Sequence, residues 1–188
     1  MTGAEASYDA DYPDHLSRAL IFVKWILLIP QFIVLYILQV VVAIVHFLNW
    51  FAVLFTGNTP DGLFNFSLGF ERWRARVSGY LLLQTDKYPP FSMDDDPNYP
   101  IRVNATKPER IQRWRCFVQW IPALLAAIIL LFIGLATYIG VFFAWFAILI
   151  TGKYPKSLFN LTSTALRYSV RLDLYLYLYS TTFPTTDA

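Results

Sequence analysis

Two sets of arginine and asparagine residues are the strongest candidates for chemistry in this sequence. Asn65, Arg72 and Arg76 are separated by seven and then four residues, so they lie on one side of an α-helix. The same residue types recur 95 positions later, at Asn160, Arg167 and Arg171. Because a guanidinium offers a planar pair of donors to phosphate, these residues are candidate contacts for the headgroups of anionic lipids. The alternative is structural: the arginines pair with carbonyl groups at helix ends or follow the positive-inside rule.

Two further polar residues lie within apolar stretches. His46 is a candidate haem ligand, quinone contact or proton relay, because ionisable residues inside membrane segments are often functional. The alternative is a neutral imidazole that is hydrogen-bonded inside a helix bundle; Val141 holds the matching position in the second half, and His15 is the only other histidine. Lys24, whose counterpart is Gln119, is expected to extend its long stem toward the headgroups.

The sequence lacks the patterns of common catalytic and cofactor sites. We find no P-loop, no dinucleotide-binding glycine pattern, no metal-ligand cluster and no nucleophile triad. The acidic run 94–96 lacks the glycine and glutamate spacing of a calcium loop, so a solvated linker is the simpler interpretation. We therefore expect a protein that is not an enzyme and that binds no metal or cofactor. The basic segments adjoin aromatic residues, which favours lipid phosphate over nucleic acid as their partner.

These candidate residues belong to two copies of one sequence unit. A shift of 95 positions aligns the halves without a gap, and it places Trp50-Phe51-Ala52 on Trp145-Phe146-Ala147. Self-similarity at a fixed period indicates a tandem duplication. We expect four regions: an acidic N-terminal tail, a first membrane repeat, a proline-rich polar linker and a second membrane repeat, at residues 1–15, 16–91, 92–110 and 111–186.

Each unit contains a long apolar stretch. Residues 19–55 contain one lysine and no other formal charge, and residues 116–150 contain none. The chain is 56% hydrophobic and 15% charged, against a usual charged share of about a quarter. Both stretches exceed the ~18 apolar residues that suggest a membrane span, so we predict an all-α integral membrane protein. Five tryptophans are expected to anchor it at the membrane interface: Trp25, Trp50, Trp73, Trp120 and Trp145.

The apolar stretches are too long for a simple span. One helix over residues 19–55 would be roughly 55 Å long, whereas the hydrocarbon core is about 30 Å thick. Each stretch is therefore either a transmembrane hairpin or one long span after a break at Ile29-Pro30. A hairpin puts every basic cluster on one side, as the positive-inside rule prefers. We favour four spans, with turns near Gly134, Thr137 and Gly140 and with both termini and the linker in the cytoplasm.

A second helix is expected to follow each apolar stretch. Gly57 and Gly152 suit the left-handed position that ends a helix, and Pro60 and Pro155 suit the start of the next one. Apolar residues then recur at three- and four-residue steps, which predicts an amphipathic helix in the membrane interface. In the second copy, the alternation over residues 172–179 by itself favours a strand. The ungapped match to the first copy predicts a helix there.

The repeat unit resembles a family of small bacterial inner-membrane proteins that is described only as a domain of unknown function. The shared pattern is an aromatic-rich span, the motif L-x-T-G-x-x-P, spaced arginines and a Tyr-Pro-Pro-Phe exit. In the first copy these are Trp50 to Gly57, Pro60, Arg72-Trp73, Arg76, Tyr80 and Tyr88-Pro89-Pro90-Phe91. The second copy departs at its exit, which reads Phe183-Pro184. The resemblance implies the bacterial inner membrane and supplies no activity.

Three functions remain open from the sequence. The first is a non-enzymatic accessory or scaffold subunit of a larger inner-membrane complex, with membrane lipids and other membrane proteins as partners in a hetero- or homo-oligomer. The second is an anionic-lipid-binding or transport protein that uses the arginines and a cavity between the repeats. The third is a redox or quinone-associated subunit, which would depend on His46. No nucleic acid partner is expected.

Overall fold

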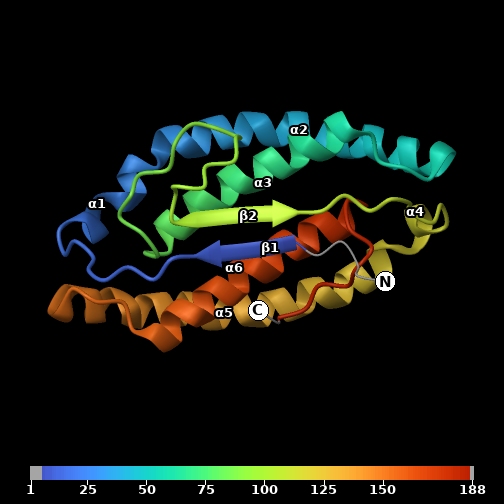
Figure 1. Ribbon diagram of the computed structural model, residues 1–188. Helices are drawn as coiled ribbons and strands as arrows, with labels where there is room; N and C mark the ends of the chain where they lie inside the picture. Colours follow the sequence, from blue (N-terminus) through green and yellow to red (C-terminus); the bar gives the residue numbers. More distant parts are fainter. Residues whose placement is uncertain (1–5, 187–188) are drawn as a thin grey trace.

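The computed structural model describes residues 6–186, and its elements form three layers (Figure 1). The first layer is an antiparallel ribbon of two strands, β1 (Ala6–Ala10) and β2 (Ile101–Ala105). Beneath the ribbon lie α3 (Asp61–Leu81) and α6 (Lys156–Leu176), which share a hydrophobic core with the strands. The fold is therefore mostly helical, and the all-α prediction missed the ribbon.

Two long helices form the third layer. They are α2 (Ile29–Thr56) and α5 (Trp120–Thr151), which lie at opposite edges of the view in Figure 1 and run in opposite directions. The short helix α1 (Leu20–Leu27) leads into α2, and the short helix α4 (Arg115–Val118) leads into α5. The long helices pack against α3 and α6 and not against the ribbon, because separate sides of α3 and α6 are used for the two contacts.

The two sides of α3 illustrate this division. Phe64, Leu68 and Ala75 belong to the core that α3 shares with the ribbon. Trp73 and Val77 belong instead to the core between α3 and α2. The apolar side of α3 is thus covered by α2, so the aromatic face that we expected in the acyl region of a membrane is buried inside the protein. Trp73 is 5% exposed and is not an interface anchor.

The two halves are related by an approximate two-fold axis. Tyr8 pairs with Val103 at the centre of the ribbon, and these residues are themselves 95 positions apart, so the axis passes through this pair. At one end of the molecule, the Leu16 N–H donates to the Gly152 carbonyl over 2.8 Å. At the other end, the equivalent Ile111 N–H donates to the Gly57 carbonyl over the same distance. The duplication predicted from the sequence is therefore also a structural symmetry.

The repeat extends further than the sequence indicated. We predicted residues 1–15 as an acidic tail and residues 92–110 as a polar linker. Residues 1–5 lie outside the described part, but 6–10 and 101–105 are the two matching strands, with the same alternation of buried and exposed side chains. Alternation over five residues is a weak strand signal, and partner strands so far apart in the chain become visible only in the fold.

The predicted helix boundaries are largely confirmed. Gly57 and Gly152 end the long helices with φ of 75° and 73°, in the left-handed region. Pro60 and Pro155 directly precede the first turns of α3 and α6. The alternating segment of the second copy is helical through Leu176, as the match to the first copy predicted.

The hairpin prediction is wrong. Neither apolar stretch folds back on itself: Ile29–Thr56 and Trp120–Thr151 are each one continuous helix, and Gly134, Thr137 and Gly140 lie within α5. Thr137 fits a helix because its hydroxyl donates to the Ile133 carbonyl one turn earlier, over 2.8 Å. No proline lies in the middle of α5 to interrupt the hydrogen bonds. The alternative, one long segment with a break before it, is what the structure has: Pro30 lies in the first turn of α2, directly after α1.

Most of the surface of the long helices faces outward. Two segments, Leu20–Thr56 and Trp120–Thr151, are long and apolar enough to cross a membrane. Within the most apolar part of each, only 22% and 17% of the residues are buried. A core helix of a water-soluble protein would be mostly buried. The exposed apolar surface of these two helices is instead typical of helices that contact lipid or another apolar partner.

Candidate functional site

The candidate lipid-binding arginines are bonded to the protein itself. The Arg72 Nε donates to the Val103 carbonyl over 3.0 Å, and the equivalent Arg167 Nε donates to the Tyr8 carbonyl over 3.3 Å. Each arginine therefore holds the outer edge of one strand at the two-fold axis. Arg72 also donates to the Asn104 side-chain oxygen over 3.0 Å. These contacts support the structural interpretation of the arginines, except that the arginines bind carbonyl groups of the ribbon and not carbonyl groups at helix ends.

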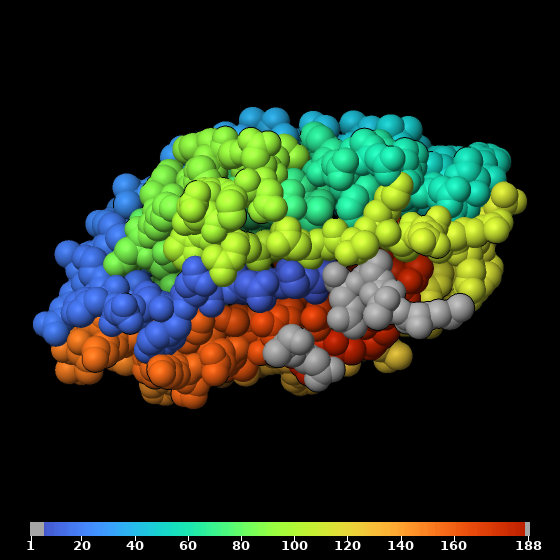
Figure 2. All heavy atoms as spheres, viewed as in Figure 1, coloured from blue at the N-terminus to red at the C-terminus, as the bar shows by residue number. Residues whose placement is uncertain are grey.

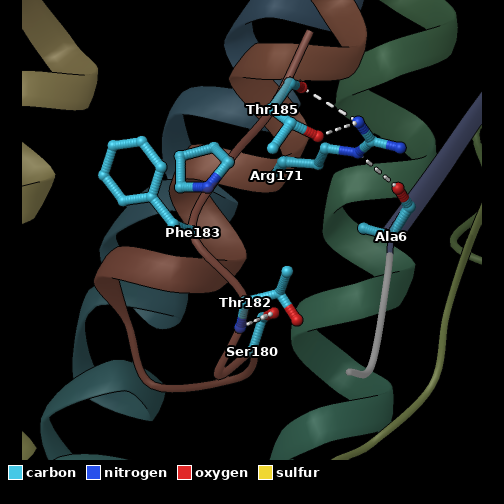
Figure 3. A pocket seen from close by; sticks show the side chains of 7 residues that line it. Ala6, Arg171, Ser180, Thr182, Phe183 and Thr185 are labelled. Carbon is cyan, nitrogen blue, oxygen red and sulfur yellow. Dashed lines mark hydrogen bonds between the residues drawn. The ribbon is translucent and has the colours of Figure 1, made fainter. Parts of the chain in front are cut away.

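The second arginine of each set also binds backbone. Arg76 is 1% exposed, and its Nη2 donates to the Asp94 carbonyl over 2.6 Å, which fixes the segment between α3 and β2. Arg171 extends between β1 and the C-terminal segment (Figure 3): its Nε donates to the Ala6 carbonyl over 2.9 Å and its Nη1 to the Thr185 carbonyl over 2.9 Å. Asn65 and Asn160 are exposed near the starts of α3 and α6.

A charged cluster that the sequence did not single out joins the two repeats. Arg74 of α3 donates to the Glu71 carboxylate over 2.6 Å and also forms an ion pair with Asp173 of α6. Burial raises the pKa of Glu71 to about 7, with Arg74 acting in the opposite direction and Asp173 adding to the rise. Burial lowers the pKa of Arg74, but its two carboxylate partners together raise it above the usual value. The guanidinium therefore stays charged.

The sequence did not indicate this cluster, because its residues are not repeated in the other copy. The matching positions in the other copy hold Ser78, Leu166 and Ser169, so a comparison of the two halves does not point to it. The only available signal was the pair Glu71 and Arg74, three residues apart on one side of a predicted helix.

Lys24 points into the protein and not toward headgroups. Its side chain is 1% exposed, its Nζ donates to the Thr85 carbonyl over 2.7 Å, and it forms an ion pair of 2.8 Å with Asp86. The same nitrogen lies 4.7 Å from the centre of the Tyr80 ring. The prediction of an extended, headgroup-facing lysine is thus wrong: Lys24 ties the start of the first apolar segment to the end of α3. The equivalent Gln119 donates to the Tyr175 carbonyl over 2.8 Å.

His46 packs against an aromatic ring. Its imidazole is half-buried and stacks on Tyr177, with ring centres 3.6 Å apart and planes inclined by 22°. Tyr179 lies next to this stack, with ring centres 5.5 Å apart. Within residues 6–186, no group of three or more histidine, cysteine, aspartate or glutamate side chains is arranged to hold a metal ion.

Two grooves that share a few matching positions lie beside the long helices. Between α2 and the end of the second repeat, a groove of about 290 Å³ is lined by Gln39 and His46 of α2 and by Tyr177. Its counterpart in the second repeat measures about 480 Å³ and lies between α5 and α6. There Gly134 replaces Gln39 and Leu82 replaces Tyr177, so the second groove is almost wholly apolar.

The tryptophans divide into outward and inward sets. Trp25 and Trp120 are 57% and 56% exposed and lie near the starts of the two apolar segments. Trp50 and Trp145 are half-buried, and the Trp50 Nε1 donates to the Cys116 carbonyl over 3.0 Å. Trp25 and Trp120 thus have the exposure that interface anchors need.

The family of this chain follows from a comparison with known sequences. A family model described as a domain of unknown function (DUF4389) matches residues 18–93 and again residues 113–186. The chain therefore belongs to this family and contains its domain twice in tandem, as the resemblance in the sequence predicted. Strands β1 and β2 lie outside both matched regions. No curated protein and no solved structure matches the chain.

Proposed function

We propose that this protein is a non-enzymatic, membrane-embedded scaffold or accessory subunit of a larger inner-membrane complex. The observation that carries the proposal is the outward apolar surface of α2 and α5. Tyr36 in the first half of α2 and Tyr138 near the middle of α5 are 77% and 70% exposed. Exposed apolar patches larger than a few hundred Å² mark contacts with membranes or with other proteins, and this surface runs the length of both helices.

The polar groups support a structural role for the interior. Within the described residues, the arginines, Lys24 and the Glu71–Arg74–Asp173 cluster bind other parts of the chain. Charged groups used in this way fix the packing of elements and are not free to contact a substrate. A protein that holds a fixed shape in the membrane and offers apolar helices to its neighbours fits a scaffold better than an enzyme.

The proposed location is the bacterial inner membrane, with the termini and the segment between the repeats on the cytoplasmic side. Support comes from the resemblance of the repeat unit to bacterial inner-membrane proteins and from the ribbon, which brings the segments before both repeats to one face. A multi-pass arrangement would require α2 and α5 each to cross the bilayer once, in opposite directions.

Lipid binding is the second candidate function, and the apolar groove between α5 and α6 favours it. A groove of about 480 Å³ lined by Leu131, Leu135 and Leu166 suits part of an acyl chain. Binding of a headgroup by the arginines is a separate prediction. It is tested by the double variant Arg72→Ala with Arg167→Ala, compared with Lys107→Ala, in native mass spectrometry with anionic lipids. Selective loss of lipid in the double variant would restore the headgroup interpretation.

A redox or quinone-associated role would need His46 to contact a cofactor. The stack of His46 on Tyr177 already gives the imidazole a packing partner within the chain. A visible absorption spectrum of the purified protein tests this third possibility directly. A haem band that disappears in His46→Ala but persists in His15→Ala would support it.

The scaffold proposal is tested by native mass spectrometry after extraction in a mild detergent. The protein should stay in the membrane pellet under alkaline carbonate and then appear with other subunits at a fixed stoichiometry. Photo-crosslinking residues at positions 36 and 138 should link to those subunits, whereas the same residue at the exposed position 9 on the ribbon serves as the control. Release by carbonate would overturn the membrane proposal, and a lone species with bound lipid would favour the lipid-binding candidate.

A further inference from the structure

We propose that α2 and α5 lie within one leaflet, with their axes close to the membrane plane, and that the ribbon faces water. Neither helix then crosses the bilayer. This inference rests on the proposed membrane location and specifies how the protein contacts the lipid. It is argued from the lengths of the helices, from the charges at the two-fold axis and from the edges of the ribbon.

The length of α5 does not suit a crossing. The helix has 32 residues, which corresponds to about 48 Å, and it is apolar from Trp120 to Ile150. It would have to tilt by about 50° to fit a hydrocarbon core about 30 Å thick, beyond the 0–40° range of observed tilts. Together α1 and α2 are longer still, with 37 residues from Leu20 to Thr56. A helix that lies in the membrane plane has no such restriction.

Charged side chains lie at the centre of the molecule. In a membrane-crossing arrangement with α2 and α5 antiparallel, the two-fold axis through Tyr8 and Val103 would lie at the bilayer midplane. Asp9 and Arg102 are the next pair along the ribbon from that axis. Asp9 is exposed, and the Asp11 side chain that pairs with Arg102 is 60% exposed. A crossing would place these charges in the middle of the hydrocarbon, where they are very unfavourable.

The ribbon itself is unsuited to hydrocarbon. It has only two strands, so neither outer edge pairs with a third strand; the arginines bind the Ala6, Tyr8 and Val103 carbonyls there. Sheet edges without a strand partner do not occur in contact with lipid tails. Figure 2 shows β1 and the chain between α3 and α4 as a strip that runs across one face of the molecule, with parts of the helices visible on both sides of it. Asp94, Asp95 and Asn104 are exposed along this strip. The polar residues thus follow a strip along the length of the molecule and are not confined to its two ends.

The opposite face has the features of a surface that sinks into a leaflet. The helices α3 and α6 lie between the ribbon and the long helices, because they share one core with the ribbon and separate cores with α2 and with α5. A helix is about 10 Å across, which matches the depth to which in-plane helices enter a leaflet. Arg18, Arg113 and Lys153 are exposed at the ends of the long helices, where they would meet lipid phosphates.

Cysteine labelling from the two sides of the membrane tests this arrangement. In a Cys116→Ala background, single cysteines replace Arg18 and Asn58, which flank α1 and α2, and Arg113 and Lys153, which flank α5. A membrane-impermeant maleimide is applied to intact spheroplasts and to inside-out vesicles. All four positions should be labelled in the same preparation, because both ends of each helix lie on one side.

Two further variants give matched controls. Asp9→Cys on the ribbon should be labelled together with the four end positions, and Tyr36→Cys on the exposed side of α2 should not be labelled from either side. Labelling of Arg18→Cys and Asn58→Cys from opposite sides would overturn the in-plane arrangement while leaving the membrane location intact. Release of the protein by carbonate would instead overturn the location.

Discussion

The long helices of the two repeats occupy equivalent places but are attached in different ways. The first segment is held by buried polar side chains: Lys24, Gln31 and Asn49 donate to the carbonyls of Thr85, Pro89 and Tyr177. In the second segment, Ala126 matches Gln31 and Ala144 matches Asn49. Both alanines are fully buried. Small residues let helices approach closely, so packing in the second repeat replaces the hydrogen bonds of the first.

This difference indicates what a duplicated domain must retain. The hydrogen bonds that hold the ribbon edges at the axis are kept by Arg72 and Arg167, because both halves contribute to one shared ribbon. The contacts of each long helix diverged, since buried alanines replace Gln31 and Asn49 in the second copy. The Glu71–Arg74 pair is present in the first copy only, and its contact with Asp173 joins the repeats to one another.

The largest effect is expected from Arg74→Ala. It leaves Glu71 and Asp173 without their shared cation, which should cost about 3 kcal/mol of unfolding free energy when the partial exposure of Arg74 is taken into account. The matched control is Ser169→Ala at the equivalent position of α6, which should change stability by less than about 0.5 kcal/mol. Denaturant unfolding in detergent measures both. Equal effects of the two substitutions would contradict the importance of the cluster.

Lys24→Ala should have the next largest effect. It removes a buried, charge-assisted contact to Asp86 and should cost about 2–3 kcal/mol, whereas Gln119→Ala removes a neutral hydrogen bond and should cost about 1 kcal/mol. The same unfolding measurement ranks the two variants. If Gln119→Ala proved the more harmful, the first helix would not depend on its polar attachments.

Gly140→Val tests the close packing of the second repeat. A Cβ at this glycine would lie 3.4 Å from the side chains of Leu158 and Leu161, so the larger valine should push α5 from α6 at a cost of about 1–2 kcal/mol. Val45 is the matching residue in α2, and Val45→Ala should cost less than about 1 kcal/mol. Hydrogen exchange of α6 amides should rise in Gly140→Val. Unchanged protection there would mean that close packing does not hold α5.

Over any single pH unit, Glu71 should give the smallest effect, visible as a dependence of stability on pH. Its pKa is raised to about 7 in the folded protein, so the folded state binds its proton more tightly than the unfolded state. Stability should therefore fall by about 1 kcal/mol for each pH unit as the pH rises from about 4.5 through 7. Glu71→Gln should flatten this fall, because the glutamine does not titrate. A profile identical to that of the unaltered protein would show that Glu71 titrates normally.

Several features were readable from the sequence because they depend on local chemistry or on comparison of the two halves. The duplication followed from aligned residues, and the ends of the long helices followed from Gly57 and Gly152, where only a residue that tolerates positive φ fits well. The apolar character of α2 and α5 followed from composition alone. Each of these conclusions needs only neighbouring residues or the internal repeat.

The direction in which a long polar side chain points was not readable in this way. Lys24 and the paired arginines looked like contacts to lipid, yet their partners are carbonyls and carboxylates on other elements. A basic residue beside an apolar segment has the same sequence signature whether it turns outward to phosphate or inward to a carbonyl. Only the position of the partner distinguishes the two.

The sequence by itself determined the duplication, the family, the apolar helices and their ends. The tertiary structure alone decided that neither apolar stretch folds back as a hairpin, that the segments before the repeats pair as a ribbon, and that Arg74 joins the two halves. The physical reason is distance along the chain. Helix ends and apolar character depend on residues a few positions apart, whereas the pairing of Tyr8 with Val103 and the contact of Arg74 with Asp173 exist only after distant segments have packed together.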